Sequence, residues 1–176
     1  MDDILELFAQ HGHSEYGGEA VTQLEHALQA AFFAERQAAP ANLIAAALVH
    51  DVGHLLHSLP DDAPDQGIDD AHEILATRWL ADRFGPAVCE PVRLHVTAKR
   101  YLCAVEETYF GQLSAPSVLS LGLQGGPMTP EEAREFERMP FAQESVQLRR
   151  WDDAAKVVDL QTPGIDYYAK FVALAD

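Results

Sequence analysis

The residues of this chain best suited to chemistry are the neighbours His50 and Asp51, which stand in the apolar stretch 43–57. A histidine and an aspartate on a buried helix are costly to remove from water unless a metal ion or a charged partner faces them. The carboxylate of Asp51 has two oxygens, so it can bridge two metal ions while the imidazole of His50 binds one of them. The pair therefore predicts a metal centre. His54, one helical turn beyond His50, is expected at the edge of that centre.

Further side chains have the types needed to complete a two-metal cage. They are His26, His72, His95 and Asp152. Four imidazoles and two carboxylates suit iron, manganese or zinc, and residue types alone do not choose among these metals. The two cysteines have neither metal-motif spacing nor a disulfide framework. Asp152 has a competing interpretation, in which it pairs with Lys156 one turn further along the chain.

The elements expected to position these residues are helices, because no segment shows the two-residue alternation of a strand. We expect Asn42 to cap a helix that runs to about Ser58 and carries the His50-Asp51 pair. We expect Thr129-Pro-Glu-Glu132 to open another helix as a capping box. The remaining expected helices span 2–10, 21–37, 70–84, 87–99, 144–156 and 165–174, with short ones at 106–113 and 116–121. Without a repeat or linker, residues 1–176 are predicted to form one compact all-α domain.

Composition narrows the compartment and the partners. A hydrophobic fraction of 48% is typical of a globular protein, and the longest apolar stretch is too short to span a bilayer. The formal net charge of −16 disfavours nucleic acid and anionic membranes as partners, although the charge of a metal site can still attract a small anionic substrate. The acidic N-terminus does not resemble a signal peptide, so we expect a cytoplasmic protein. The oligomeric state is left open.

The order His26, His50-Asp51 and Asp152 resembles the H…HD…D signature of the HD-domain superfamily, whose members are helical metalloenzymes and mostly phosphohydrolases. His72 and His95 resemble the extra ligands of the subset that binds two metals. Longer segments, over nearly the whole chain, resemble the HD-domain phosphonate-cleaving oxygenases of the PhnZ type, relatives of myo-inositol oxygenase. These segments span residues 16–26, 48–54, 67–73, 94–106, 123–128 and 148–156.

The resemblance implies an activity and a cofactor. Members of that family use a mixed-valent di-iron centre, Fe(II)/Fe(III), and O2 to cleave the C–P bond of an α-hydroxyphosphonate, which gives inorganic phosphate and a carboxylate. For this chain the resemblance implies two iron ions on the six ligands named above, with Asp51 as the bridge. It also implies 2-amino-1-hydroxyethylphosphonate as substrate and glycine as product. An ammonium, a trimethylammonium or a hydrogen on the hydroxyphosphonate all stay open, with Asp69 and Glu106 as candidate contacts for an amine.

The resemblance also implies roles outside the ligand set. Tyr16 matches a tyrosine that can occupy the substrate's position at the iron, and Glu19 matches a glutamate that helps to exchange it for substrate. The neighbouring Gly17-Gly18 pair would give such a loop its backbone freedom, although an ordinary turn with one aromatic anchor also explains it. The resemblance also implies that His54 and Lys99 lie near the phosphonate. Ser117 and Gln124 are candidates for the lining of its pocket, although a helix start and a plain turn explain them equally well. Arg149, one helical turn before Asp152, is expected to support that carboxylate.

Two other functions are compatible with the sequence. The first is an HD-type phosphohydrolase that acts on a nucleotide or phosphate ester through a metal-activated water. The second is a non-catalytic helical domain with a degenerate site. All six expected ligands are present, which argues against degeneration. Tyr16, Glu19 and Lys99 favour the oxygenase over the hydrolase.

Overall fold

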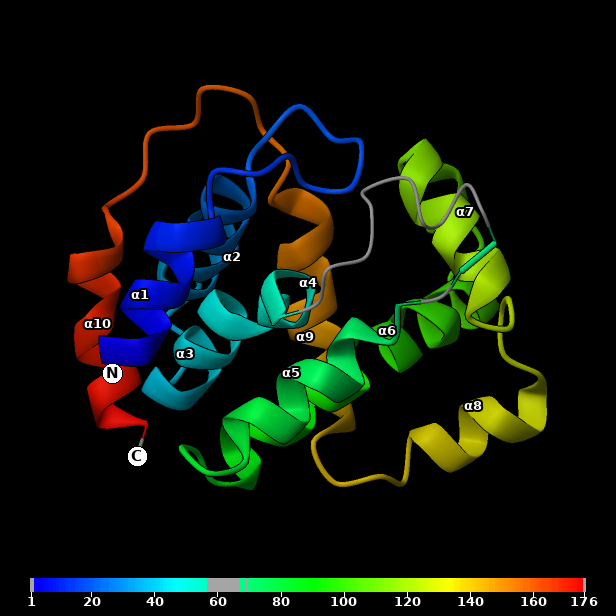
Figure 1. Cartoon of the computed structure of the whole chain (residues 1–176). Helices are drawn as coiled ribbons and strands as arrows, with labels where there is room; N and C mark the ends of the chain where they lie inside the picture. The colour runs from blue at the N-terminus through cyan, green and yellow to red at the C-terminus, as the bar shows by residue number, and fades with distance from the viewer. Residues whose placement is uncertain (1, 57–66, 69, 176) are drawn as a thin grey trace.

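A computed structural model describes residues 2–56, 67–68 and 70–175 of the chain. Within these ranges all regular secondary structure is helical (Figure 1). The sole strand-like feature of the described residues is an isolated antiparallel bridge between Glu15 and Thr22. The prediction of an all-α fold is confirmed. Among the described helices, none combines the length and the apolar character needed to cross a lipid bilayer.

The helices follow one another through short connections. Their bounds are α1 Asp2–His11, α2 Gln23–Arg36, α3 Ala41–Val49, α4 Val52–Leu56, α5 His72–Leu80, α6 Pro86–Val105, α7 Ala115–Leu123, α8 Pro130–Phe136, α9 Ala142–Ala154 and α10 Ile165–Leu174, with a 3₁₀ helix η1 at Phe110–Gln112. The predicted capping box at Thr129 is confirmed, because its hydroxyl accepts from the N–H of Glu132 and its own N–H donates to the Glu132 carboxylate. The helix predicted over 106–113 is wrong, since η1 alone forms there; Gly111 in its middle disfavours an α-helix.

Helix α3 runs through the middle of the main core. Every residue from Leu43 to Val49 is buried, and the alanines at 45–47 let neighbouring helices approach closely. Helices α2, α6, α9 and α10 all pack against α3. Because these helices surround it, α3 delivers its C-terminal end, at His50, to the centre of the protein.

Helices α6 and α9 pack against each other and join the main core to a smaller one. The smaller core contains Leu94 and Ala98 of α6 together with Phe136 of α8. Helices α7 and α8 lie on the side of the molecule opposite α1 and α10 (Figure 1). The candidate ligands of α6 and α9 therefore lie between the main core and this α7–α8 side.

The predicted role of Asn42 as a helix cap is wrong. Helix α3 begins directly after Pro40, whose fixed φ suits the position before a helix, and Asn42 lies inside the first turn. The Asn42 side-chain amide instead donates to the carbonyl of Ala87 in α6, at 3.3 Å. That carbonyl lacks its usual helical partner because Pro91, four residues later, has no N–H. Asn42 thus supplies the missing hydrogen bond and ties α3 to α6.

The prediction of one continuous helix to Ser58 is wrong, because the helix is interrupted at His50 and Asp51. α3 ends at Val49, His50 and Asp51 form a turn, and α4 begins at Val52. The turn is tightened by a hydrogen bond from the His54 N–H to the Asp51 carbonyl, at 3.0 Å. Ser58 lies outside the described residues.

Candidate metal centre

Four imidazoles and two carboxylates from five parts of the fold converge on one buried point. His26 comes from α2, His50 and Asp51 from the turn after α3, His72 from the start of α5, His95 from α6 and Asp152 from α9. None of these side chains belongs to a residue more than 7% exposed. All six ligands predicted from the sequence are therefore brought together, and Asp51 lies between them.

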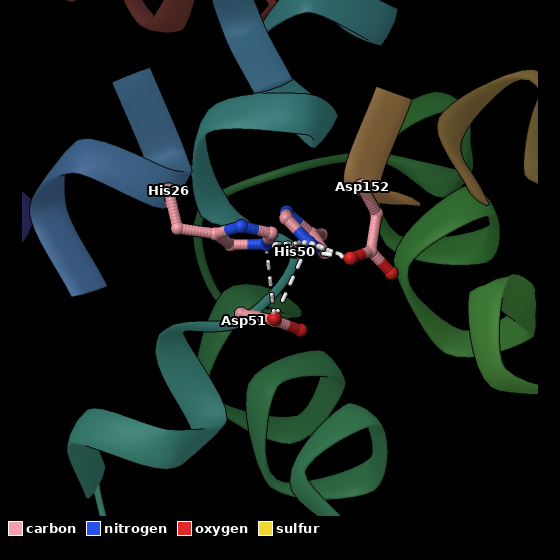
Figure 2. A group of neighbouring side chains, drawn as sticks. All are labelled: His26, His50, Asp51 and Asp152. Atoms are coloured by element: carbon pink, nitrogen blue, oxygen red, sulfur yellow. Dashed lines mark hydrogen bonds and ion pairs between the residues drawn. The ribbon is translucent and has the colours of Figure 1, made fainter. Parts of the chain in front are cut away.

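One oxygen of Asp51 faces the first group of donors. The Nε2 atoms of His26 and His50 lie 3.5 and 3.3 Å from Asp51 Oδ2, and 3.2 Å from each other. Asp152 Oδ1 lies 3.4 Å from His26 Nε2 and 3.9 Å from His50 Nε2 (Figure 2). We call His26, His50, Asp152 and Asp51 Oδ2 the first donor set.

The other oxygen of Asp51 faces the second group. His72 Nε2 and His95 Nε2 lie 3.5 and 3.4 Å from Asp51 Oδ1, and 3.2 Å from each other. We call His72, His95 and Asp51 Oδ1 the second donor set. The two oxygens of one carboxylate thus serve two donor sets, which is the arrangement that a bridging ligand requires.

The other ring nitrogen of each histidine is held by an acceptor. His26 Nδ1 donates to the Ala155 carbonyl, His50 Nδ1 to that of Ala47 and His95 Nδ1 to that of Val92, at 2.8, 2.9 and 2.6 Å. His72 Nδ1 donates to the carboxylate of Asp70 at 2.8 Å. Carbonyls and carboxylates only accept hydrogen bonds, so Nδ1 carries the hydrogen in each ring. A neutral ring therefore presents the lone pair of Nε2 to the centre, as metal-binding histidines do.

These donors fit a metal ion in each set. In the second donor set, two Nε2 lone pairs that face each other at 3.2 Å cannot satisfy one another, and the buried Asp51 Oδ1 has no hydrogen-bond donor among the described residues. Burial opposes a charge on His50, yet Asp51 raises the pKa of its imidazole to about 10, so the first donor set favours a positive charge. Burial lowers the pKa of His72 to about 4, which keeps that ring neutral and able to bind a cation. A cation between the Nε2 atoms and the carboxylates would meet each of these needs.

Tyr16 lies directly beside the first donor set. Its hydroxyl donates to Asp51 Oδ2 at 2.7 Å and lies 3.5 Å from Asp152 Oδ1, while its ring stacks on His26 with centroids 3.7 Å apart. Burial and both carboxylates hold its pKa well above the ordinary value, so the phenol keeps its proton. The following Gly17 and Gly18 both have positive φ, a conformation that favours glycine, and it lets the loop turn toward the centre.

A cavity of about 410 Å³ adjoins the centre. Its lining includes the positions that the sequence assigned to substrate: Tyr16, Glu19, His54, Lys99, Ser117 and Gln124. Lys99 Nζ donates to Ser120 Oγ at 2.8 Å, and burial, together with the charge of Arg149, lowers its pKa to about 7. The structure thus brings these positions to one space, and their roles stay predictions.

Lys156 and Ser120 also line this cavity, and the sequence did not single them out for substrate. Lys156 Nζ forms an ion pair with Glu19 at 3.0 Å and donates to Ser117 Oγ at 3.0 Å. The proposed pair of Lys156 with Asp152 is therefore wrong. The sequence signal that could have placed Lys156 near the site is its position four residues after Asp152, a predicted ligand.

Arg149 holds Asp152 in place, as its spacing predicted. Arg149 Nη1 lies 2.7 Å from Asp152 Oδ2, which leaves Oδ1 for the first donor set. The same guanidinium pairs with Asp153 and donates to the hydroxyl of Tyr109 at 3.3 Å, and that hydroxyl also donates to Asp153. Arg149 and Asp152 are 4% and 1% exposed, so the pair between them is shielded from water.

The second donor set depends on a close approach of α4 to the start of α5. A Cβ on Gly53 would lie 1.9 Å from the carbonyl oxygen of His72, a distance at which real atoms overlap. Only glycine at position 53 lets the backbone of His72 approach α4 this closely.

The sequence named Glu106 and Asp69 as candidate contacts for a substrate amine. Glu106 pairs with Arg150 and does not line the cavity, and Asp69 lies outside the described residues.

Comparison with known proteins agrees with this geometry. A family model described as "HD domain" matches residues 23–176, so the chain belongs to the HD-domain family. A hydroxymethylphosphonate dioxygenase of Gimesia maris is 49% identical over 96% of this chain and 84% of its own length. A [1-hydroxy-2-(trimethylamino)ethyl]phosphonate dioxygenase (glycine-betaine-forming) of Leisingera caerulea is 41% identical over 94% of this chain and 85% of its own. An uncharacterized protein, L432, of Acanthamoeba polyphaga mimivirus is 36% identical over 96% and 78%. The resemblance to HD-domain phosphonate oxygenases is thereby confirmed, and the chain is an enzyme of the oxygenase class.

Proposed function

We propose that this protein uses O2 and two iron ions to cleave the C–P bond of an α-hydroxyphosphonate, with release of inorganic phosphate and a carboxylate. The observation that carries the proposal is the placement of Asp51 between two pairs of Nε2 atoms, beside a cavity that contains two lysines. Two relatives named as dioxygenases of hydroxyphosphonates support it. The reaction balances with O2 as the only oxidant, because R–CH(OH)–PO3H2 and O2 together contain the atoms of R–COOH and H3PO4.

The six ligands support iron at both donor sets. Imidazole and carboxylate donors suit a redox-active first-row metal, and an Fe(II)/Fe(III) pair would supply the oxygen and electron chemistry that the side chains lack. The first donor set would hold one ion through His26, His50 and Asp152, and the second the other through His72 and His95. Asp51 would bind both.

The lysines of the cavity would bind the phosphonate. Lys99 and Lys156 bring two positive charges into a chain of net charge −16, and a small anion can approach them through the cavity. Ser117 and Ser120 already accept hydrogen bonds from these lysines, so a phosphonate oxygen would take over contacts that exist. Gln124 offers its side-chain amide, and His54 a ring nitrogen, to the remaining oxygens.

Tyr16 would occupy the position of the substrate hydroxyl until the substrate binds. Its hydroxyl now occupies the space beside the first donor set, and a substrate hydroxyl must displace it to reach the same place. Glu19 lies on the same loop and is tied to Lys156, so a phosphonate that pairs with Lys156 would release Glu19 and loosen the loop. Binding and displacement would thus be linked through one ion pair.

We propose 2-amino-1-hydroxyethylphosphonate as the substrate, with glycine as the product. The carboxylates of Glu19 and Asp70 line the cavity and offer negative charge to a substrate ammonium. The substrates in the names of the two relatives carry a hydrogen or a trimethylammonium group instead. Competition among the three hydroxyphosphonates in one reaction, measured as relative kcat/KM, tests the choice of substrate.

We also propose that residues 1–176 form a single HD domain and that the protein acts in the cytoplasm.

The test of the function is electron paramagnetic resonance on protein loaded with iron without oxygen and then partly oxidised. We expect a coupled Fe(II)/Fe(III) signal that shifts when hydroxyphosphonate is added, and phosphate release that requires O2. With ¹⁸O2, label should enter the carboxylate product. Phosphate release from phosphate esters with zinc or magnesium and without O2 would instead establish the HD-type phosphohydrolase.

Tyr16→Phe provides a second test of this function. The variant keeps the stacked ring and loses the hydroxyl beside Asp51 and Asp152. We expect both irons to stay bound and the signal before substrate addition to change. An unchanged signal would exclude the hydroxyl from the centre.

A further inference from the structure

Asp70 connects a candidate metal ligand to a candidate substrate contact. Its Oδ1 accepts hydrogen bonds from His72 Nδ1 at 2.8 Å and from the His72 backbone N–H at 3.2 Å. Its Oδ2 lies 2.7 Å from His54 Nδ1. The rings of His54 and His72 stack with centroids 4.0 Å apart and an interplanar angle of 24°. One carboxylate thus fixes two parallel imidazoles.

This arrangement sets His72 apart from the other three ligand histidines. His26, His50 and His95 are held by peptide carbonyls, whose positions the helices determine. His72 is held by a charged side chain, which is a stronger acceptor than a carbonyl and makes the imidazole a better donor to a metal. The carboxylate presents Oδ1 to His72 and Oδ2 to His54, so each of its oxygens holds one ring.

We propose that Asp70 is a positioning residue that orients His72 toward the second metal ion and His54 toward the phosphonate. The His54 half of this proposal rests on the proposed function, whereas the His72 half rests on the donor geometry alone. A ring whose Nδ1 is fixed presents Nε2 in a defined direction, and both rings border the cavity. Because the two rings share one carboxylate, a change at either oxygen reaches both the metal centre and the substrate site.

The first arm of the test measures iron binding without turnover. Asp70→Asn keeps the shape of the side chain but replaces one acceptor oxygen by an NH2 group, so it cannot accept from both histidines. In equilibrium dialysis with Fe(II) under nitrogen, we expect about 10–100-fold weaker binding of the second ion and little change for the first. Asp70→Ser, which keeps a smaller acceptor, should show the same direction and serves if the asparagine variant folds poorly.

Glu73→Gln is the matched control. Its Oε2 lies 3.9 Å from His72 Nδ1, so the substitution removes the same charge near the same ring but no hydrogen bond to it. We expect its iron affinities within about fivefold of wild type, the size of a partly screened charge effect. Equal losses in Asp70→Asn and Glu73→Gln would reduce the role of Asp70 to its charge and overturn the proposal.

The second arm measures binding of inorganic phosphate, the expected product, at iron concentrations that saturate both positions. Asp70→Asn and His54→Ala should each weaken phosphate binding, and the double variant should be no weaker than His54→Ala alone. The weaker binding of the second iron, measured by dialysis as in the first arm, should persist in the double variant. Additive losses of phosphate affinity would show that Asp70 does not act through His54.

The two arms separate this inference from the proposed function. If the wild-type protein releases no phosphate from any hydroxyphosphonate, the function fails, yet the iron-binding arm still tests Asp70 and His72. If Asp70→Asn binds both irons with wild-type affinity and gives the wild-type resonance signal, the inference fails even though the oxygenase activity stands.

Discussion

The two donor sets on either side of Asp51 are built differently. The first set contains four candidate ligand residues, and the main core surrounds them: His26 and His50 are fully buried and Asp152 is clamped by Arg149. The second set contains three, and His72, the first residue of α5, is held by the Asp70 side chain and by the close approach at Gly53. The first set is thus fixed by helix packing, and the second by local contacts.

This difference indicates where external ligands can enter. The first set has more protein donors, but Tyr16 occupies the neighbouring space on a loop with two glycines of positive φ. The second set has fewer protein donors, and its ring of His72 borders the cavity. An external ligand could therefore reach the first set by displacing the Tyr16 side chain. It could reach the second set directly, because fewer protein donors would hold a metal ion there.

The largest effect is expected at Asp51, because it belongs to both sets. Asp51→Ala should lose both metal ions and all measurable oxygenase activity, while Asp152→Ala should lose the first ion and keep the second. Metal analysis after gel filtration and phosphate release check both outcomes. Retention of two irons by Asp51→Ala would exclude Asp51 as the bridge.

Gly53→Ala should damage the second set alone. The added Cβ would overlap the His72 carbonyl oxygen, so the start of α5 must move and carry the imidazole with it. We expect the second ion to bind about 10–100-fold more weakly, with the first ion retained, as measured by metal titration. Gly122→Ala is the control, since a Cβ on that helical glycine meets no atom within 4 Å in the described part of the chain. Equal behaviour of the two variants would show that the close approach is unimportant for metal binding.

Arg149→Met should damage the first set alone. The substitution leaves the buried carboxylate of Asp152 and the partly exposed carboxylate of Asp153 without their shared cation. The free energy of unfolding of the metal-free protein should fall by about 3–5 kcal/mol, and metal should restore part of it because a cation again faces Asp152. Urea denaturation with and without metal measures this. Arg150→Met, at a half-exposed pair with Glu106, should cost at most about 1 kcal/mol. A first set that binds metal normally in Arg149→Met would refute the clamp.

The sequence predicts the first set and much of the second because residue types limit the candidates. A histidine within an apolar helical stretch needs a partner, and His50 lies in such a stretch. His26 and His95 followed as candidates from their residue type and from the family resemblance. The interruption of the helix at His50-Asp51 was not predictable, since the apolar pattern continues through these residues and the break depends on packing. Asn42 resembles a cap locally, but the distant Pro91 determines its bond.

Asp70 shows why the local contacts of the second set are harder to foresee. An Asp-Asp pair two and three residues before His72 is a weak signal, and the sequence alone cannot tell which of the two carboxylates turns toward the ring. Its second partner, His54, lies sixteen positions away, beyond a stretch of acidic residues and prolines. Such contacts depend on how the chain returns to α5, and no local pattern encodes that path.

The smallest expected effect lies at Lys99, whose charged neighbours Arg149, Asp152 and Asp153 come from α9, on the side of the first set. Burial first, and then the charge of Arg149, lower its pKa to about 7, below the ordinary 10.5. Between these values the folded chain binds fewer protons than the unfolded chain, so Lys99 makes stability rise with pH from about 7 to 10.5. Phosphonate binding needs the ammonium form, so affinity should fall by up to about tenfold between pH 7 and pH 8.

Two variants isolate this effect and connect it to the comparison of the donor sets. Lys99→Arg stays charged, so the ratio of its phosphonate affinity to that of wild type should rise with pH and cancel the ionisation of the phosphonate itself. Arg149→Met removes the positive charge that lowers the Lys99 pKa, and should move the fall in affinity to higher pH. Gly53→Ala, which acts on the second set, should leave the pH of the fall unchanged. A shift in Gly53→Ala equal to that in Arg149→Met would mean that the two sets do not act separately on the substrate site.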